Sequence, residues 1–157
     1  MGAPPSMEIF FHMIRGNKMM VPGGGPVALP TVSPRDAGEI AAQAVLRDDL
    51  SGLRIKMTGP KAYSFPEAAA TISAAWNRKI VFRKIPLLIP NTIRGILTPL
   101  CPFSDRFLYV HTLLGFIRLL NHFPQSLVDE VPKLHQYLVS TFDYRPTTLE
   151  MEAEKRL

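Results

Sequence analysis

The sequence predicts an α/β fold, and the prediction depends on three observations within residues 29–86. Two segments begin with a serine shortly before a proline, at Ser33 and at Ser64, and continue with an apolar pattern of helical spacing. Each of these helical segments is followed by a short β-like run that ends next to a proline. The order is therefore strand end, helix, strand, helix and strand, and such alternation is typical of α/β domains.

The first helix is expected to begin at Ser33, because serine is a preferred N-cap residue and the proline after it suits the first helical position. Asp36 lies in the first turn, where the helix dipole favours an acid. We therefore expect a capping or dipole role for Asp36 instead of a role as a catalytic acid. The apolar face of this helix is formed by Ala37, Ile40, Ala41, Ala44 and Val45, with Glu39, Gln43 and Arg47 on the opposite side.

The next elements are a strand, a second helix and another strand. Arg54–Thr58 alternates apolar and polar residues and is followed by a Gly-Pro pair, which predicts a short strand. The second helix begins with the S-x-x-E capping box from Ser64 to Glu67. Ile80–Ile85 is again β-like. The apolar face of the second helix is formed by Phe65, Ala68, Ala69, Ile72 and Trp76.

Upstream of this block, Met7–Ile14 has helical character and is expected to end at Gly16. Two β-like runs then flank the triple glycine Gly23–Gly25. This triple glycine is predicted to form a tight turn and not a phosphate-binding loop. A phosphate loop leads into a helix N-terminus, whereas Pro26 and another extended run follow here.

Downstream, prolines interrupt the chain into short helical pieces. Phe107–Phe123 is the most apolar stretch and is predicted to be a buried or interface helix. A further helix is expected near Val131–Phe142, and a final acidic helix is expected after an N-cap at Thr147, three residues before Glu150.

Composition argues against several kinds of site. Cys101 is the only cysteine, so neither an intrachain disulfide nor a cysteine zinc cluster can form, which suits a reducing compartment such as the cytoplasm. The four histidines are scattered, and no pair has the spacing of a zinc helix, so we predict no metal site. Without a G-x-S-x-G elbow, serine hydrolase chemistry is not expected either.

The net charge of +5 is concentrated in residues 51–104, where eight Lys and Arg stand against one acid, Glu67. No cationic run exceeds two residues and no aromatic ladder is interleaved, so nucleic acid is not an expected partner. Phe107–Phe123 contains Arg118 and is too short and polar to span a bilayer. The first residues lack the pattern of a signal peptide, so a membrane role is not expected.

Taken in order, these features resemble the NmrA-like NAD(P)-binding proteins of the atypical short-chain dehydrogenase/reductase group. Asn77 stands where that family more often has glycine, and asparagine also tolerates the left-handed conformation. The residues that carry the resemblance are Asp36 at the start of an alanine-rich helix, Thr58-Gly59-Pro60, Ser64 and Glu67, Asn77-Arg78 and Ile85-Pro86.

The resemblance implies an incomplete NAD(P)-binding Rossmann-like fold with a mostly helical C-terminal lobe and a few short strands. Residues 1–157 would form one domain, the C-terminal portion of the family fold, with a mixed α/β part at 1–86 and a mainly helical lobe at 87–157. The complete parent would be an NAD(P)-dependent oxidoreductase or a redox-sensing NAD(P)-binding protein that acts on a small molecule.

The catalytic residues of the family do not carry over to this sequence. No Gly-rich dinucleotide fingerprint lies between a strand and a helix, and none of the four tyrosines is followed by the lysine of a Tyr-x-x-x-Lys pair. We therefore expect a fragment or truncated isoform that binds no NAD(P) alone and has no catalytic residues. Phe10, Phe11 and His12 resemble the segment that flanks the nicotinamide in complete homologues, and they are candidate pocket-lining residues. Helix-core packing is the alternative role for them.

A different class of function stays open beside the oxidoreductase. If strands such as Arg54–Thr58 keep unpaired edges, a truncated isoform would act as a non-enzymatic protein-interaction module. That reading predicts a homo-oligomer or a protein partner. Peripheral membrane binding through Phe107–Phe123 is a weaker alternative. No residue pattern assigns the substrate or distinguishes NAD from NADP.

Overall fold

The computed structural model describes residues 6–23, 27–85 and 123–157. The predicted helix at 107–123 lies outside these ranges except for its last residue, as do the proline-interrupted pieces before it and Cys101. The elements are α1 (Glu8–His12), β1 (Ile14–Arg15), β2 (Lys18–Pro22), α2 (Pro34–Val45), the 3-10 helix η1 (Asp48–Leu50), α3 (Phe65–Ala75), β3 (Val81–Ile85), α6 (Gln125–Asp129), α7 (Val131–Thr141) and α8 (Leu149–Glu154).

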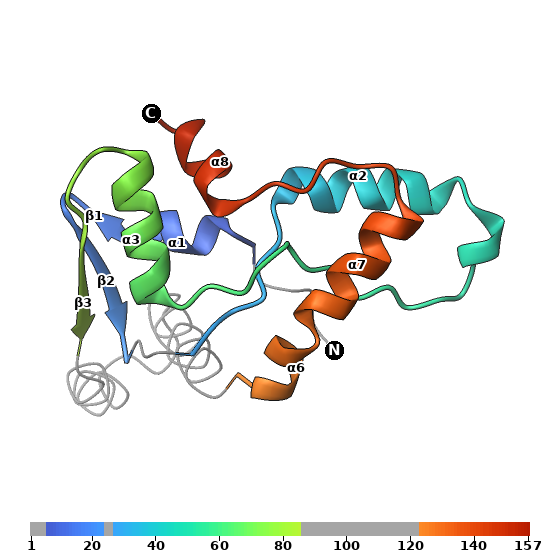
Figure 1. Ribbon diagram of the computed structural model, residues 1–157, viewed down its shortest axis with the longest axis horizontal. Helices are drawn as coiled ribbons and strands as arrows, with labels where there is room; N and C mark the ends of the chain where they lie inside the picture. Colours follow the sequence, from blue (N-terminus) through green and yellow to red (C-terminus); the bar gives the residue numbers. More distant parts are fainter. Residues whose placement is uncertain (1–5, 24–26, 86–122) are drawn as a thin grey trace, which may run out of the picture.

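A three-stranded sheet of order β1-β2-β3 lies at one end of the molecule (Figure 1). β1 and β2 form an antiparallel hairpin, and β2 runs parallel to β3 in the register Lys18 with Val81 to Pro22 with Ile85. Gly16, with φ of +59°, lies in the hairpin turn. The expected helix end at Gly16 is therefore wrong, because α1 already ends at His12 and Ile14–Arg15 pair with β2.

The larger hydrophobic core packs α1, α3 and α8 against this sheet. The indole N–H of Trp76, just after α3, donates to the carbonyl of Ala153 in α8 at 2.8 Å, which fixes the two helices together. The predicted buried face of α3 is confirmed for Phe65, Ala68, Ala69 and Ile72. Trp76 is partly buried at the edge of the core. Fully buried side chains of this core include Phe10, Met19, Leu29, Phe65, Ile72 and Leu149.

The start and end of α3 follow from local sequence signals. The hydroxyl of Ser64 accepts the backbone N–H of Glu67 at 3.4 Å, and the carboxylate of Glu67 accepts the backbone N–H of Ser64 at 2.9 Å. The predicted capping box is thus confirmed. Its hydrogen bond from the Ser64 backbone holds the pKa of Glu67 below its usual value. Asn77 has φ of 45° directly after α3, the left-handed conformation expected at this position.

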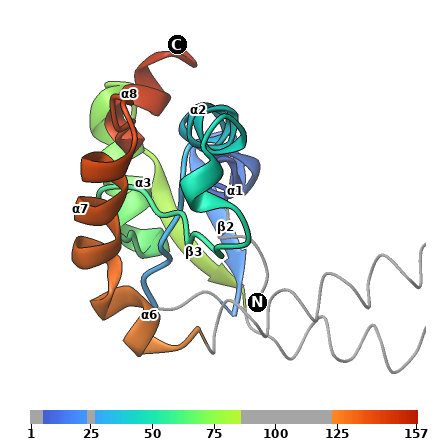
Figure 2. The same ribbon diagram turned by 90° about the vertical axis from the view of Figure 1, so that its right-hand side faces the viewer.

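A second, smaller hydrophobic cluster joins α2, η1 and α7 at the other end of the molecule (Figures 1 and 2). Its buried members are Ile40, Leu50, Leu138 and Phe142. The predicted helices α2 and α7 are confirmed, but the apolar face expected for α2 is partly wrong. Val45 is 85 % exposed and Ala41 is exposed, because the helix is rotated so that Asp36 and Ile40 face inward.

An extended segment from Leu29 to Ser33 runs between the two clusters. Leu29 and Tyr63 exchange two backbone hydrogen bonds of 2.9 and 3.1 Å, and Gly59 donates its N–H to the carbonyl of Thr31 at 2.9 Å. A Cβ on Gly59 would lie 2.5 Å from that same oxygen. Glycine is therefore required at position 59 by the close approach of two backbones.

Two expected details of the secondary structure are wrong. Arg54–Thr58 forms no strand, since its backbone has no ladder partner among the described residues. The N-cap of α8 is Thr148, whose hydroxyl accepts the N–H of Met151 at 3.4 Å, and not Thr147. Ser33 precedes α2 as expected, but its buried hydroxyl makes no capping bond. Within the described ranges, no helix is long and apolar enough to cross a bilayer.

Substitution of Gly59 by alanine tests the backbone contact between the two segments. We expect Gly59→Ala to lower the free energy of unfolding by about 1–3 kcal/mol, because the new methyl group displaces the carbonyl of Thr31. Urea denaturation followed by circular dichroism measures the change. Gly38→Ala is the matched control. It lies within α2 with open space around it, so alanine should stabilise the protein by about 0.5–1 kcal/mol. Equal effects at both positions would contradict the contact.

Candidate functional site

Phe10, the first candidate pocket residue, lies in the centre of the larger core. Its side chain is fully buried, and its ring makes edge contacts with Phe65 at 5.4 Å and with Tyr63 at 6.4 Å between ring centroids. Contacts of this kind stabilise a core beyond the area that they bury. The structure therefore places Phe10 in the packing role, and its role beside a ligand stays a prediction.

The two neighbouring candidates face different surroundings. Phe11 is partly buried, with the guanidinium of Arg156 at 4.3 Å from its ring centroid and Trp76 at 6.1 Å. His12 is exposed, and its Nδ1 lies 2.8 Å from the carbonyl oxygen of Glu8. The surroundings of the three candidates thus range from the core at Phe10 to the surface at His12. Their lining of a pocket stays a prediction.

Asp36 binds a residue far away in the sequence. Its Oδ2 accepts the backbone N–H of Thr147 at 2.7 Å, and its Oδ1 accepts the hydroxyl of Thr147 at 2.6 Å. The residue is 1 % exposed. Both carboxylate oxygens are thus occupied, so Asp36 is a structural acceptor and not a free base. Of the two expected roles, capping is wrong, because the carboxylate binds the segment before α8, whereas the position of Asp36 in the first turn of α2 agrees with the dipole role.

Two more side chains of α2 hold the same segment. Gln43 donates to the carbonyl of Asp143 at 2.7 Å and accepts the N–H of Asp143 at 2.9 Å. Arg47 donates to the carbonyl of Thr141 at 2.7 Å. Sequence reasoning placed Gln43 and Arg47 on the solvent side of α2. A stripe of polar residues at helical spacing can also bind the backbone of a connector, and the sequence does not distinguish these two uses.

Unpartnered buried polar groups surround this connection. Nδ1 of His135 and the hydroxyl of Tyr144 are buried without a hydrogen-bond partner in the described part of the chain. Burial lowers the pKa of His135, against a smaller opposite effect of the Asp36 charge. Burial raises the pKa of Tyr144, and Asp36 adds to that rise. The hydroxyls of Thr31 and Ser33, two residues of the extended segment, are buried in the same unpartnered way.

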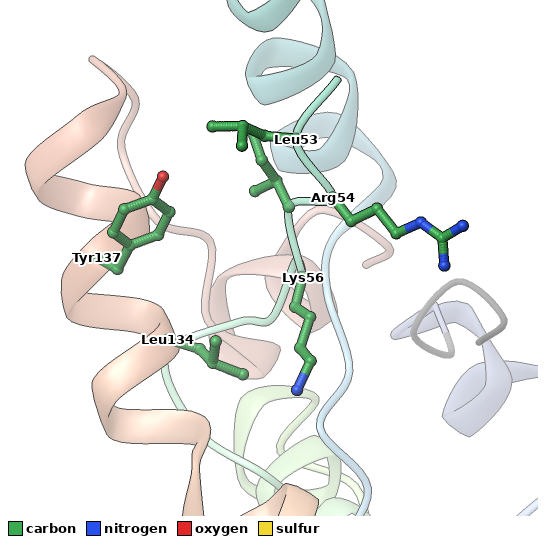
Figure 3. A pocket seen from close by; sticks show the side chains of 6 residues that line it. Leu53, Arg54, Lys56, Leu134 and Tyr137 are labelled. Atoms are coloured by element: carbon green, nitrogen blue, oxygen red, sulfur yellow. The ribbon is translucent and has the colours of Figure 1, made fainter. Parts of the chain in front are cut away.

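An open groove of about 330 Å³ lies between the extended residues after η1 and helix α7 (Figure 3). Its wall on α7 is formed by Leu134 and Tyr137, and Figure 3 shows the side chain of Arg54 pointing away from that helix. Lys56 binds Glu130 at 3.0 Å. No pattern in the sequence indicates this groove. The groove is lined by Leu53, Arg54, Ile55, Lys56, Leu134 and Tyr137.

In the described ranges, no group of three or more His, Cys, Asp or Glu side chains is arranged to hold a metal ion. Asp36, the one carboxylate that the sequence raised as a catalytic acid, has both oxygens bound to Thr147.

The sequence matches no protein-family model, and no curated protein matches it. Solved structures do match. A nucleoside-diphosphate-sugar epimerase from Staphylococcus aureus aligns with a TM-score of 0.66 at 17 % identity, covering 97 % of this chain and 50 % of that protein. An NADPH-dependent quinone oxidoreductase from Escherichia coli aligns with a TM-score of 0.64 at 11 % identity, covering 98 % of this chain and 52 % of that protein.

The chain thus spans about half the length of the structures that it matches. The predicted α/β class is confirmed: the protein has a mixed α/β fold with a three-stranded sheet, and it matches part of the Rossmann-like fold of these two structures. At these identities the likeness concerns the fold alone.

A double-mutant cycle tests the link between Asp36 and Thr147. Asp36→Ala and Thr147→Val should each lower the free energy of unfolding by about 1.5–3 kcal/mol, since each leaves a buried group without its partner. The double variant should lose little more than the worse single variant. Arg35→Ala, which removes an exposed ion pair with Glu39, is the control and should change stability by less than about 0.5 kcal/mol. Strict additivity of the two losses would contradict the link.

The pKa of His135 predicts a pH dependence of stability. Because its pKa is lowered in the folded state from the ordinary value of 6.5, the unfolded chain binds this proton more readily. The contribution of His135 is therefore complete above about pH 6.5 and is lost as the pH falls towards the lowered value. The urea concentration at the midpoint of unfolding should therefore fall as the pH is lowered from about 7.5 to about 5.5. His135→Gln should flatten that fall, whereas His12→Gln at an exposed site should leave it unchanged.

Proposed function

We propose that this chain forms the substrate-side half of an NAD(P)-dependent oxidoreductase, or of a redox-sensing NAD(P)-binding protein of the NmrA-like kind. The observation that carries the proposal is that two solved structures match nearly the whole chain while it covers only about half of each. One of them is an NADPH-dependent quinone oxidoreductase. The order of helices α2 and α3 followed by strand β3 gives separate support.

The described helix starts do not fit a bound dinucleotide. A pyrophosphate binds where free backbone N–H groups and the positive end of a helix dipole meet it. Here the three helices longer than two turns each have an acid at or next to the first turn, namely Asp36 in α2, Glu67 in α3 and Glu130 before α7. A phosphate at these positions would face like charge. In this proposal the cofactor is held by the half of the fold to which this chain has no counterpart.

This assignment makes residues 1–157 a lobe that shapes a substrate site and does not itself transfer hydride. Phe10, Phe11 and His12 remain the candidates nearest to the nicotinamide in the complete protein. The packing of Phe10 between Tyr63 and Phe65 would then fix the position of α1, so that its exposed end faces the site.

A non-enzymatic protein-interaction module is the second candidate. It is favoured by the backbone of Arg54–Met57, which makes no hydrogen bond with other described residues. Sedimentation of the purified chain tests this candidate. A compact monomer that binds no protein would exclude it.

Calorimetric titration with NADPH tests the first proposal on the chain as given. We expect no saturable binding at dissociation constants of about 10 μM or below, because an acid stands at or next to the start of each of the helices α2, α3 and α7. The Escherichia coli quinone oxidoreductase, titrated in parallel, is the positive control. Micromolar or tighter binding by residues 1–157 would contradict the absence of a cofactor site.

The coding sequence immediately upstream of Met1 tests the other part of the proposal. We expect a Gly-rich strand–turn–helix there in the complete gene. An upstream sequence without such a fingerprint would contradict the assignment to an NAD(P)-dependent parent, even if calorimetry shows no binding.

A further inference from the structure

The backbone of Arg54–Met57 is extended and has no backbone partner among the described residues. Before it, the N–H of Leu53 donates to the carbonyl of Leu50 at 3.1 Å. After it, the N–H of Gly59 donates to the carbonyl of Thr31 at 2.9 Å. Between these two fixed points, the N–H and C=O groups of Arg54–Met57 make no hydrogen bond with any residue that the structure describes. An extended backbone with free donors and acceptors is a template for pairing with another strand.

The side chains of this segment alternate as they do in a strand with one covered face. Ile55 and Met57 pack against the smaller cluster around Ile40 and Leu138, whereas Arg54 and Lys56 are exposed. The covered face fixes which way each residue points. A strand that pairs with the segment would therefore find the same side chains on the same face in every complex.

The groove beside this segment has apolar walls that the protein leaves in contact with water. Leu53 is 60 % exposed and Tyr137 is 45 % exposed, and Figure 3 shows Leu134 on the same helix as Tyr137, across from Lys56. The volume of about 330 Å³ is enough for several side chains of an extended peptide. Aromatic and aliphatic side chains on such a wall suit alternate residues of a bound strand.

The charges select the partner. Arg54 has no ion pair within the described ranges. Lys56 forms an ion pair with Glu130, and both side chains are about half exposed. If a second copy paired in antiparallel fashion around Ile55 or Lys56, or in parallel register, its cations would lie opposite these cations. Like charges directly opposite each other destabilise a pair of strands. A second copy is therefore disfavoured, and a strand with acidic side chains is favoured.

We propose that this groove binds an extended, acidic segment of a protein partner by β-strand addition to Arg54–Met57. Acidic side chains of the partner lie beside Arg54 and Lys56. Its alternate apolar side chains lie against Leu53, Leu134 and Tyr137. The inference gives the binding site and the chemical class of the partner for the protein-interaction module named above. It rests on the module candidate, in which no further part of the fold covers this segment.

The probe is a short synthetic peptide of alternating glutamate and valine with a fluorescent label, and binding is followed by anisotropy. A peptide of alternating lysine and valine should bind at least about tenfold more weakly. Two further Glu-Val peptides are N-methylated, one at every glutamate and one at every valine. Because alternate N–H groups of a strand point to the same side, one of them should lose about tenfold in affinity and the other much less.

Variants of the protein locate the site. Arg54→Glu and Leu53→Ser should each weaken binding of the Glu-Val peptide by about tenfold. Lys79→Glu and Leu157→Ser are matched controls at exposed positions outside the groove and should change it by less than about twofold. Equal binding of the Lys-Val peptide, or no loss with either N-methylated peptide, would overturn the proposal. So would a loss with Lys79→Glu as large as with Arg54→Glu.

The oligomeric state gives a separate readout. We expect that sedimentation shows no dimer whose formation depends on Leu53, as tested with Leu53→Ser. Such a dimer would mean that a second copy occupies the groove, which contradicts the acidic partner. If the chain associates elsewhere and binds no Glu-Val peptide, the groove proposal fails while the general module candidate stands.

Discussion

The carboxylate of Asp36 accepts two hydrogen bonds from Thr147, and the arrangement of the rest of the chain depends on this contact. α2 belongs to the smaller hydrophobic cluster and α8 to the larger one, and Thr147 stands directly before α8. Each buried hydrogen bond to a charged group is worth about 1.5–3 kcal/mol. The two bonds therefore help to hold together two parts of the chain whose apolar side chains form separate clusters. Gln43 and Arg47 extend the same connection along α2.

Local signals were sufficient where the neighbours of a residue in sequence decide its structure. The capping box of Ser64 and Glu67, the buried face of α3, and the helix near Val131 are all set within one or two helical turns. The face of α2 was misjudged because its partner, residues 141–147, lies about a hundred residues further along the chain. Nothing in a helical pattern tells a polar stripe that faces water from one that binds a distant backbone.

The same limit explains the two threonines and the missing strand. Thr147 and Thr148 are equally good N-caps by residue type, and the choice between them is made by Asp36, which takes Thr147. Arg54–Thr58 has the alternation of a strand, but alternation describes side chains and not the partner that a backbone needs. The groove beside this segment could not be found from sequence, since Leu134 and Tyr137 reach it only through the packing of α7.

Trp76 is the only tryptophan in the chain, and its indole N–H is bound to α8. Its fluorescence therefore reports the environment of the larger core and does not respond to changes in the smaller cluster. Loss of the α3–α8 contact would expose the indole and shift its emission to the red, whereas separation of α2 from residues 141–147 would leave the emission unchanged. The protein thus carries an optical probe that can tell whether its two cores melt together or one after the other.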